Sequence, residues 1–125
     1  MVTGLVDANV IVDLLRGYTP AQTWIGSTQT LGVTRVVWLE VLQGVQDNHK
    51  LRGALNILNQ FDLVETTISD LEWATQQSIR FTLSHRIDAL DYMIAAPSHR
   101  LQIPLYTRNL KHMSPILGTL AQEPY

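Results

Sequence analysis

Residues 3–11, TGLVDANVI, decide the fold, because a short apolar run ends there in an aspartate and passes directly into an amphipathic segment. Residues 3–6 predict the first strand. Residues 10–16 predict a helix that Gly17 ends, with Asp7 and Asn9 between the strand and the helix. A buried strand followed at once by a helix is typical of the repeating unit of a parallel α/β sheet.

The same alternation of apolar runs and helical stretches continues along the chain. Further strands are predicted at residues 31–33, 63–67 and 103–106, and helices at residues 19–24, 35–45, 48–61, 69–84 and 87–96. Thr34 is expected to cap the helix at 35–45, Ser69 and Glu72 have capping-box spacing, and Pro97 is expected to end or kink the last helix. This order predicts an α/β fold, a three-layer α/β/α sandwich with a parallel sheet of four to five strands.

The composition indicates a single compact domain over residues 1–125. Hydrophobic residues make up 46 % of the 125 residues and charged residues 16 %. The absence of cysteine excludes a disulfide framework, a thiolate zinc site and a cysteine nucleophile. No apolar run approaches the roughly 18 residues of a membrane span, and the first residues lack the pattern of a signal peptide. We therefore expect a cytoplasmic protein without membrane contact.

The formal net charge of −2 argues mildly against a general nucleic-acid binder, which usually carries a basic surplus. The charge is unevenly distributed, because acidic residues predominate in residues 1–75 and basic residues predominate in residues 76–125. A local basic rim on an acidic body is compatible with this distribution.

Polar residues follow the first and the last predicted strands. In open parallel sheets, ligands bind beyond the carboxyl ends of the strands. Asp7 follows the first strand, with Asn9 two residues later, and the last strand is followed by Thr107, Arg108 and Asn109. A simpler interpretation is that Asp7 and Asn9 cap the helix after the strand, since both residue types are preferred there. Position alone leaves both roles of Asp7 open.

Glu40 is harder to explain by a structural role alone. The helix that begins near Arg35 is apolar around most of its circumference, through Trp38, Leu39, Val41, Leu42 and Val45. A carboxylate buried there without a partner would be costly or would take up a proton. A cation beside Glu40 removes that cost. The alternative is that Glu40 reaches solvent or pairs with Arg35.

The helix predicted at residues 87–96 carries two carboxylates, Asp88 and Asp91. At about 100° per residue, Asp91 borders the apolar stripe of Leu90 and Ile94, and Asp88 lies about 60° further toward the polar side. Asp88 also stands where an N-cap residue is needed. We therefore assign Asp91 to a site and Asp88 to the helix end; an error here would exchange the two.

Converging carboxylates repel one another unless a hard cation neutralises them. Asp7, Glu40 and Asp91 offer only oxygen ligands, which select Mg²⁺ or Mn²⁺ over zinc or copper. Such a site suits phosphodiester cleavage, in which the metal activates a water, orients the phosphate and stabilises the leaving oxygen. The residues are dispersed along the chain, so their spacing does not itself establish that they converge.

Four segments together resemble the PIN-domain family, and within it the VapC-type toxins. Residues 5–11 (LVDANVI) resemble the family's first strand and its aspartate, and residues 34–44 resemble its second motif, a hydroxyl residue before an apolar helix with Glu and then Gly. Residues 91–96 (DYMIAA) resemble the third motif, and residues 105–113 (LYTRNLKHM) the closing strand and its Thr-x-Asn turn. Each motif alone is weak, but four in the family's order are specific. Pro97 and Met113 depart from the pattern.

The resemblance implies a metal-dependent endoribonuclease with Mg²⁺ or Mn²⁺ as its cofactor. Asp7 and Asp91 would bind the ion with help from Glu40, and Asn109 stands at a fourth position that some members fill with aspartate. Supporting roles are expected for Asn9 and Thr107, and contacts to the RNA substrate for Arg108 and Lys111. VapC-type toxins are similar in being homodimers that a small cognate antitoxin protein holds inactive. For each basic residue, an ordinary solvated surface charge is the alternative.

Two other functions compete with this interpretation. A response-regulator receiver domain has a similar size and α/β class, but it needs paired acids after the first strand and a phosphoacceptor aspartate at the end of a middle strand. Here Asp7 stands alone, and the predicted middle strand runs into Glu65 and Thr66. The second alternative is a catalytically silent PIN-like module that only binds a protein partner. The presence of Asp7, Glu40 and Asp91 argues against that alternative.

Overall fold

The computed structural model describes residues 1–26 and 29–125 and has a five-stranded parallel sheet in the order β3-β2-β1-β4-β5. The strands are β1 (Gly4–Val6), β2 (Leu31–Thr34), β3 (Asp62–Val64), β4 (Leu105–Tyr106) and β5 (Ala121–Gln122). The helices are α1 (Ala8–Leu15), α2 (Thr19–Ile25), α3 (Arg35–Gln43), α4 (Asn48–Leu58), α5 (Ile68–Phe81), α6 (Ala89–Leu101) and α7 (Leu110–Leu117), with a 3-10 turn at Gly118–Leu120.

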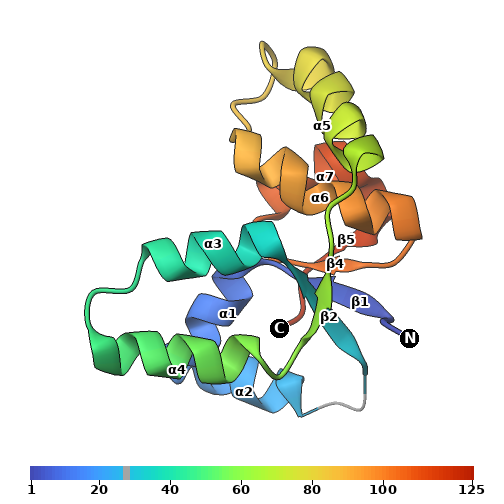
Figure 1. Ribbon diagram of the computed structural model, residues 1–125. Helices are drawn as coiled ribbons and strands as arrows, with labels where there is room; N and C mark the ends of the chain where they lie inside the picture. Colours follow the sequence, from blue (N-terminus) through green and yellow to red (C-terminus); the bar gives the residue numbers. More distant parts are fainter. Residues whose placement is uncertain (27–28) are drawn as a thin grey trace.

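The helices cover the sheet from both sides. Helices α1, α2 and α4 lie on one side, and α5, α6 and α7 lie on the other (Figure 1). Helix α3 leaves the end of β2 and packs against α1, α4 and α6. The α/β fold predicted from the sequence is therefore confirmed. In the part of the chain that the structure describes, no helix has both the length and the apolar character needed to cross a bilayer.

The buried centre of the sheet explains the register of its strands. Leu5 on β1 pairs with Gly32 on β2 and with Leu105 on β4, and both leucines are almost completely buried. Gly32 allows a close approach, because a Cβ atom there would lie 2.9 Å from Cγ2 of Val64. Continuous burial on both faces is what a parallel sheet between two helical layers requires.

Side-chain caps begin several helices where the sequence places them. Thr34 caps α3 by accepting a hydrogen bond from the backbone N–H of Val37 at 3.3 Å, as predicted. Helix α1 begins at Ala8, two residues earlier than expected, because Asp7 itself is its N-cap.

The predicted capping box of α5 is wrong by two residues. Thr67, not Ser69, is the N-cap: its Oγ1 accepts from the N–H of Asp70, and Oδ2 of Asp70 accepts from the N–H of Thr67. The observed strand β3 ends at Val64, earlier than the predicted strand at residues 63–67, and Thr67 is therefore free to act as the cap. The other carboxylate oxygen of Asp70 accepts a hydrogen bond from Arg100 at 2.9 Å, so this box is anchored to α6.

Pro97 was expected to end or kink α6, and the first of these expectations is wrong. The helix continues to Leu101, and the stretch from Ile94 to Ser98 is buried throughout. Packing of this stretch compensates for the one backbone hydrogen bond that proline cannot donate. Oγ of Ser98 also donates to the carbonyl of Ile103, which ties the end of the helix to the segment before β4. The helix that carries Asp91 is therefore held in the core by its buried C-terminal half.

Candidate functional site

Asp7 lies at the carboxyl end of β1 and at the start of α1, where it is 3 % exposed. Its Oδ1 accepts a hydrogen bond from the backbone N–H of Ala8 at 2.7 Å. Its Oδ2 accepts a hydrogen bond from the hydroxyl of Thr107 at 2.8 Å. One oxygen therefore caps the helix while the other faces the end of β4.

Thr107 and Asn9 join the ends of β1 and β4 around Asp7. Besides donating to Asp7, the buried hydroxyl of Thr107 accepts from Nδ2 of Asn9 at 3.4 Å and from the backbone N–H of Asn109 at 3.0 Å. Oδ1 of Asn9 accepts from the backbone N–H of Arg108 at 3.1 Å. These bonds hold the turn after β4 against the start of α1 and thereby fix the carboxylate of Asp7.

Glu40 is partly buried on α3, between the exposed Leu39 and the buried Val41. Its Oε2 atom is buried, and no group among the described residues forms a hydrogen bond with it. The expected alternative partner, Arg35, is engaged elsewhere, because its guanidinium lies 2.7 Å from a carboxylate oxygen of Glu65. Glu40 therefore holds an unsatisfied acceptor, which is costly unless a cation or water supplies the missing contact.

Asp91 stands in the first turn of α6 and faces α7. Its Oδ2 lies 3.4 Å from Nδ1 of His112, and the same Nδ1 lies 3.1 Å from Nδ2 of Asn109. Because one ring nitrogen either donates or accepts, Nδ1 of His112 donates to Asp91 when it carries a hydrogen and accepts from Asn109 when it does not. Sequence reasoning assigned no role to His112. Its spacing of three residues from Asn109 would have been the signal, but the helix that makes this spacing meaningful was not predicted.

Asp88 takes the structural position that was assigned to it. It is the N-cap of α6, and its Oδ1 accepts a hydrogen bond from the backbone N–H of Leu90 at 3.0 Å. Its negative charge nevertheless contributes to raising the pKa values of both Glu40 and Asp91. The carboxylate of Asp88 is therefore close enough to influence the site without being directed into it by its hydrogen bonds.

Burial raises the pKa of each of the three central carboxyl groups. The pKa of Asp7 rises from 3.8 to about 6, because lost solvation outweighs the hydrogen bonds from Thr107 and Ala8, and the charge of Asp91 adds to the rise. Burial and then the charges of Asp7 and Asp91 raise the pKa of Glu40. Burial also raises the pKa of Asp91, against the hydrogen bond to His112. The three groups, contributed by three different elements, thus lie within electrostatic reach of one another.

This group of acids, one at the end of β1, one on α3 and one on α6, is accompanied by a match to a known family. A family model described as PIN domain matches residues 4–113 of this chain. The chain belongs to the PIN domain family. The topology also excludes the receiver alternative: in receiver domains the first strand lies between the second and the third, whereas here β1 lies between β2 and β4.

Solved structures with a similar fold include a chain of a toxin–antitoxin complex. A chain of the toxin–antitoxin complex from Klebsiella pneumoniae is 21 % identical, with a TM-score of 0.80 and 98 % of both chains covered. VapBC2 from Rickettsia felis, bound to a promoter DNA fragment, is 14 % identical, with a TM-score of 0.78 and 92 % of both chains covered. FitAcB from Neisseria gonorrhoeae is 21 % identical, with a TM-score of 0.75 and with 90 % of this chain and 92 % of that chain covered. No curated protein matches this chain.

The three carboxylates of the candidate site are of the ligand type that divalent cations such as Mg²⁺ prefer. Asp7, Glu40 and Asp91 provide carboxylate oxygens, and the buried Oε2 of Glu40 lacks the partner that an ion would supply. Across residues 1–26 and 29–125, no three Asp, Glu, Cys or His side chains already form a complete ligand set. Side-chain movement would therefore accompany the binding of an ion by three of these residues.

The two basic residues that were predicted to contact RNA differ in their surroundings. Nη1 of Arg108 lies 2.9 Å from Oδ2 of Asp13, so its charge is already paired. Lys111 is exposed on the first turn of α7. Contacts of these residues with RNA remain a prediction, and the ion pair makes Arg108 a weaker candidate for a simple phosphate contact than its position after β4 indicated.

Proposed function

We propose that this PIN domain is a metal-dependent endoribonuclease that cleaves RNA phosphodiester bonds as the toxin of a toxin–antitoxin pair. The observation that carries the proposal is the group of Asp7, Glu40 and Asp91, whose pKa values are raised by burial and, for Asp7 and Glu40, by neighbouring acids of the group. Such a group is unfavourable without a cation and suits the hydrolysis of phosphodiesters. The toxin–antitoxin structures of the same fold support the toxin role.

In this proposal, Mg²⁺ or Mn²⁺ is held by Asp7 and Asp91, with Glu40 as the third donor. When bound, the ion supplies activation of water and stabilisation of the leaving oxygen. The hydroxyl of Thr107 keeps one oxygen of Asp7 directed to the sheet end. Asn109, whose side-chain nitrogen lies 3.1 Å from His112, is placed to contact water or phosphate.

Cleavage of total cellular RNA by the purified, antitoxin-free chain tests the proposal directly. The reaction is compared with Mg²⁺, with Mn²⁺ and with chelator, and for Asp7→Asn, Asp91→Asn and Asp88→Asn. Metal-dependent cleavage that is lost in the first two variants and retained in the third is the expected result. Asp88→Asn is the matched control, because it removes one charge from the same region while its position is that of a helix cap.

Each outcome bears on one part of the proposal. Loss of activity in Asp88→Asn together with retention in Asp91→Asn would reverse the roles of the two acids. No cleavage in either metal, while the folded chain still binds its antitoxin, would favour the catalytically silent alternative. The lack of a preformed three-residue ligand set among the described residues is the observation that keeps this alternative in the test.

The proposal of an antitoxin partner is supported by a groove between α1, the end of α3 and α4. The groove has a volume of about 450 Å³ and is lined by Val12, Leu15, Arg16, Val41, Gly44, Val45, Gln46, His49, Lys50 and Gly53. Apolar walls with basic residues at the rim suit an apolar antitoxin segment that also carries acidic residues. Leu15→Glu is therefore expected to weaken the toxin–antitoxin complex without affecting RNA cleavage.

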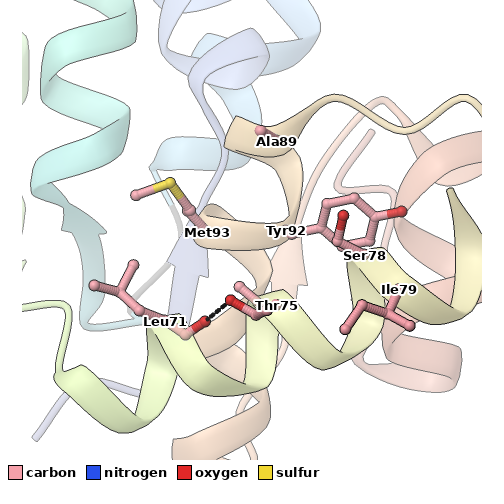
Figure 2. Close-up of a pocket in the computed structure, with 8 residues that line it drawn as sticks. Leu71, Thr75, Ser78, Ile79, Ala89, Tyr92 and Met93 are labelled. Atoms are coloured by element: carbon pink, nitrogen blue, oxygen red, sulfur yellow. Dashed lines mark hydrogen bonds between the residues drawn. The ribbon is translucent and has the colours of Figure 1, made fainter.

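A homodimer is supported by an exposed apolar stripe on α5. Ile68, Leu71 and Ile79 recur on one face of this helix at helical spacing, and Ile68 and Ile79 are 78 % and 74 % exposed. Leu71 and Ile79 also line a hollow of about 290 Å³ between α5 and α6, shown in Figure 2. Exposed apolar side chains, here interleaved with Glu72 and Thr75, are typical of a protein interface, and a second copy of the same helix offers a matching face.

Sedimentation analysis of single variants tests this dimer. Ile79→Glu is expected to convert the dimer to a monomer, because it places a charge in the stripe. Gln76→Glu adds the same charge at an exposed polar position of the same helix and is expected to leave the dimer intact. A monomeric wild-type chain, or a dimer that tolerates Ile79→Glu, would contradict the assignment.

A further inference from the structure

Tyr18, Arg108 and Tyr125 form a cluster of flat side chains, which we call the platform. The ring centroids of the two tyrosines are 5.9 Å apart, and Cζ of Arg108 lies 5.3 Å from the ring of Tyr18 and 5.4 Å from that of Tyr125. The three groups therefore meet at the corners of a nearly equal triangle instead of forming a closed stack. Tyr18 is 41 % exposed and Arg108 is exposed, so part of the cluster remains open to solvent.

The platform adjoins the candidate active site. Arg108 directly follows Thr107, which binds Asp7, and the backbone N–H of Arg108 donates to Asn9. Asp13, the ion-pair partner of Arg108, lies four residues after Asn9 on α1. Residues four apart share one helix face at a rise of about 6 Å. Asn9, which binds the turn beside Asp7, and Asp13, which binds the platform, thus lie one turn apart on the same side of α1.

The charge of Arg108 is already neutralised within the platform. Its Nη1 lies 2.9 Å from Oδ2 of Asp13, and the hydroxyl of Tyr125 donates to the same oxygen at 2.6 Å. Burial opposes ionisation of Asp13, but these two hydrogen bonds and the positive charges of Arg108 and Arg16 together outweigh it and lower the pKa of Asp13. A phosphate or an acidic peptide requires a free cation, whereas an uncharged planar group requires only flat surface.

We propose, on the basis of the function proposed above, that the platform stacks a base of single-stranded RNA beside the phosphate that is cleaved. Aromatic rings and the guanidinium plane of arginine are the surfaces on which proteins hold unpaired bases. Stacking tolerates different sequences because every base has a flat face. The platform would therefore position a single-stranded stretch over Asp7 without reading its sequence by hydrogen bonds.

Binding of a fluorescent single-stranded RNA hexamer of random sequence tests this proposal. The wild-type chain is titrated in chelator, so that metal-dependent cleavage does not interfere. Tyr18→Ala is expected to weaken binding about tenfold or more, which is the usual effect of losing one stacked aromatic ring. Tyr18→Phe keeps the ring and is expected to bind like the wild type. Tyr18 makes no side-chain cap bond to α2, so its removal spares that helix end.

The salt dependence distinguishes stacking from a phosphate contact. Stacking predicts that Tyr18→Ala and Arg108→Lys weaken binding while the slope of log K against log salt stays unchanged. A slope that falls by about one unit in Arg108→Gln would assign Arg108 to a phosphate and overturn its place in the platform. A hexamer that lacks its bases is expected to bind Tyr18→Ala and the wild type equally.

The binding experiment and the cleavage experiment can contradict the platform and the nuclease independently of each other. A chain that cleaves RNA, but whose RNA affinity is unchanged in Tyr18→Ala, would overturn the platform and leave the nuclease standing. A chain whose RNA affinity depends on Tyr18 but which cleaves nothing would overturn the nuclease and leave the platform standing. Weaker antitoxin binding in Tyr18→Ala, with unchanged RNA affinity, would assign this surface to a protein partner instead. Unfolding curves of each variant confirm that it is folded.

Discussion

Replacing Asp7 with Asn is expected to stabilise the metal-free protein at neutral pH while it abolishes nuclease activity. Asp7 is 3 % exposed, and burial raises its pKa from 3.8 to about 6. Between these two values the folded state binds more protons than the unfolded state. The free energy of unfolding therefore falls as the pH rises from 3.8 to about 6, and the full cost of ionising Asp7 is present above that window.

The structure sets the size of the effect. A rise in pKa from 3.8 to about 6 corresponds to a destabilisation of about 3 kcal/mol once the carboxyl group is ionised. Asn can still accept the hydrogen bond from the N–H of Ala8. Its amide nitrogen would face Thr107, whose hydroxyl donates to Asp7, and this mismatch costs about 1 kcal/mol. The expected net gain is about 2 kcal/mol above the window. Near pH 4 the cost of ionising Asp7 is only about 0.5 kcal/mol, so the mismatch leaves Asp7→Asn about 0.5 kcal/mol less stable than the wild type.

Urea unfolding followed by tryptophan fluorescence in chelator, at about pH 8 and about pH 4, measures this difference. A gain of about 2 kcal/mol moves the urea midpoint upward by about 1 M. Asp13→Asn is the matched control, because hydrogen bonds lower the pKa of Asp13 and its neutralisation is expected to destabilise the protein at about pH 8. Added Mn²⁺ is expected to raise the midpoint of the wild type and not that of Asp7→Asn.

A midpoint for Asp7→Asn that is equal to or lower than that of the wild type at about pH 8 would refute the reasoning. It would mean that the hydrogen bonds from Thr107 and Ala8 stabilise the carboxylate more than burial destabilises it. A gain of the same size at both pH values would also refute it, since the effect must disappear as the carboxyl group becomes protonated.

Three further predictions concern positions outside the carboxylate group. Gly32→Ala is expected to destabilise the fold by about 1–3 kcal/mol in urea unfolding, because its Cβ would lie 2.9 Å from Cγ2 of Val64. Arg100→Met is expected to cost about 2–4 kcal/mol in thermal unfolding, since it leaves the buried carboxylate of Asp70 without its ion-pair partner. Asp88→Ala is expected to cost about 1 kcal/mol through loss of the α6 cap, with RNA cleavage retained.

The sequence predicts the parts of this fold that depend on local patterns. Strands β1, β2 and β4 are short apolar runs bounded by polar residues, and Thr34 is a good N-cap wherever a helix follows. The final elements escape such reasoning. Strand β5 has only two residues, and α7 contains Pro115, which argues against a helix when it is judged without tertiary contacts. Both elements form because β5 pairs with β4 and buried residues of α7 join the core.

The unpredicted helix also explains which part of the candidate site was missed. Asp7, Glu40 and Asp91 were singled out by a strand end, an apolar helix and the border of an apolar stripe, and it was the resemblance to a family that joined them into one site. His112 and Tyr125 are ordinary residues in sequence, and they gain their contacts with Asp91 and Asp13 only from the packing of the last segments. Local periodicity carries no information on contacts between residues that lie far apart in the chain.

Asp7 shows why a structural explanation of a polar residue does not exclude a functional one. Capping of α1 occupies Oδ1, which accepts from the N–H of Ala8, and leaves Oδ2 for the hydroxyl of Thr107 at the end of β4. A carboxylate oxygen has more than one lone pair, so the same atoms that hold the helix retain capacity for a cation. The same conformation of Asp7 can therefore cap α1 and bind a cation. The difference in the free energy of unfolding between Asp7→Asn and the wild type measures how much stability the buried carboxylate costs.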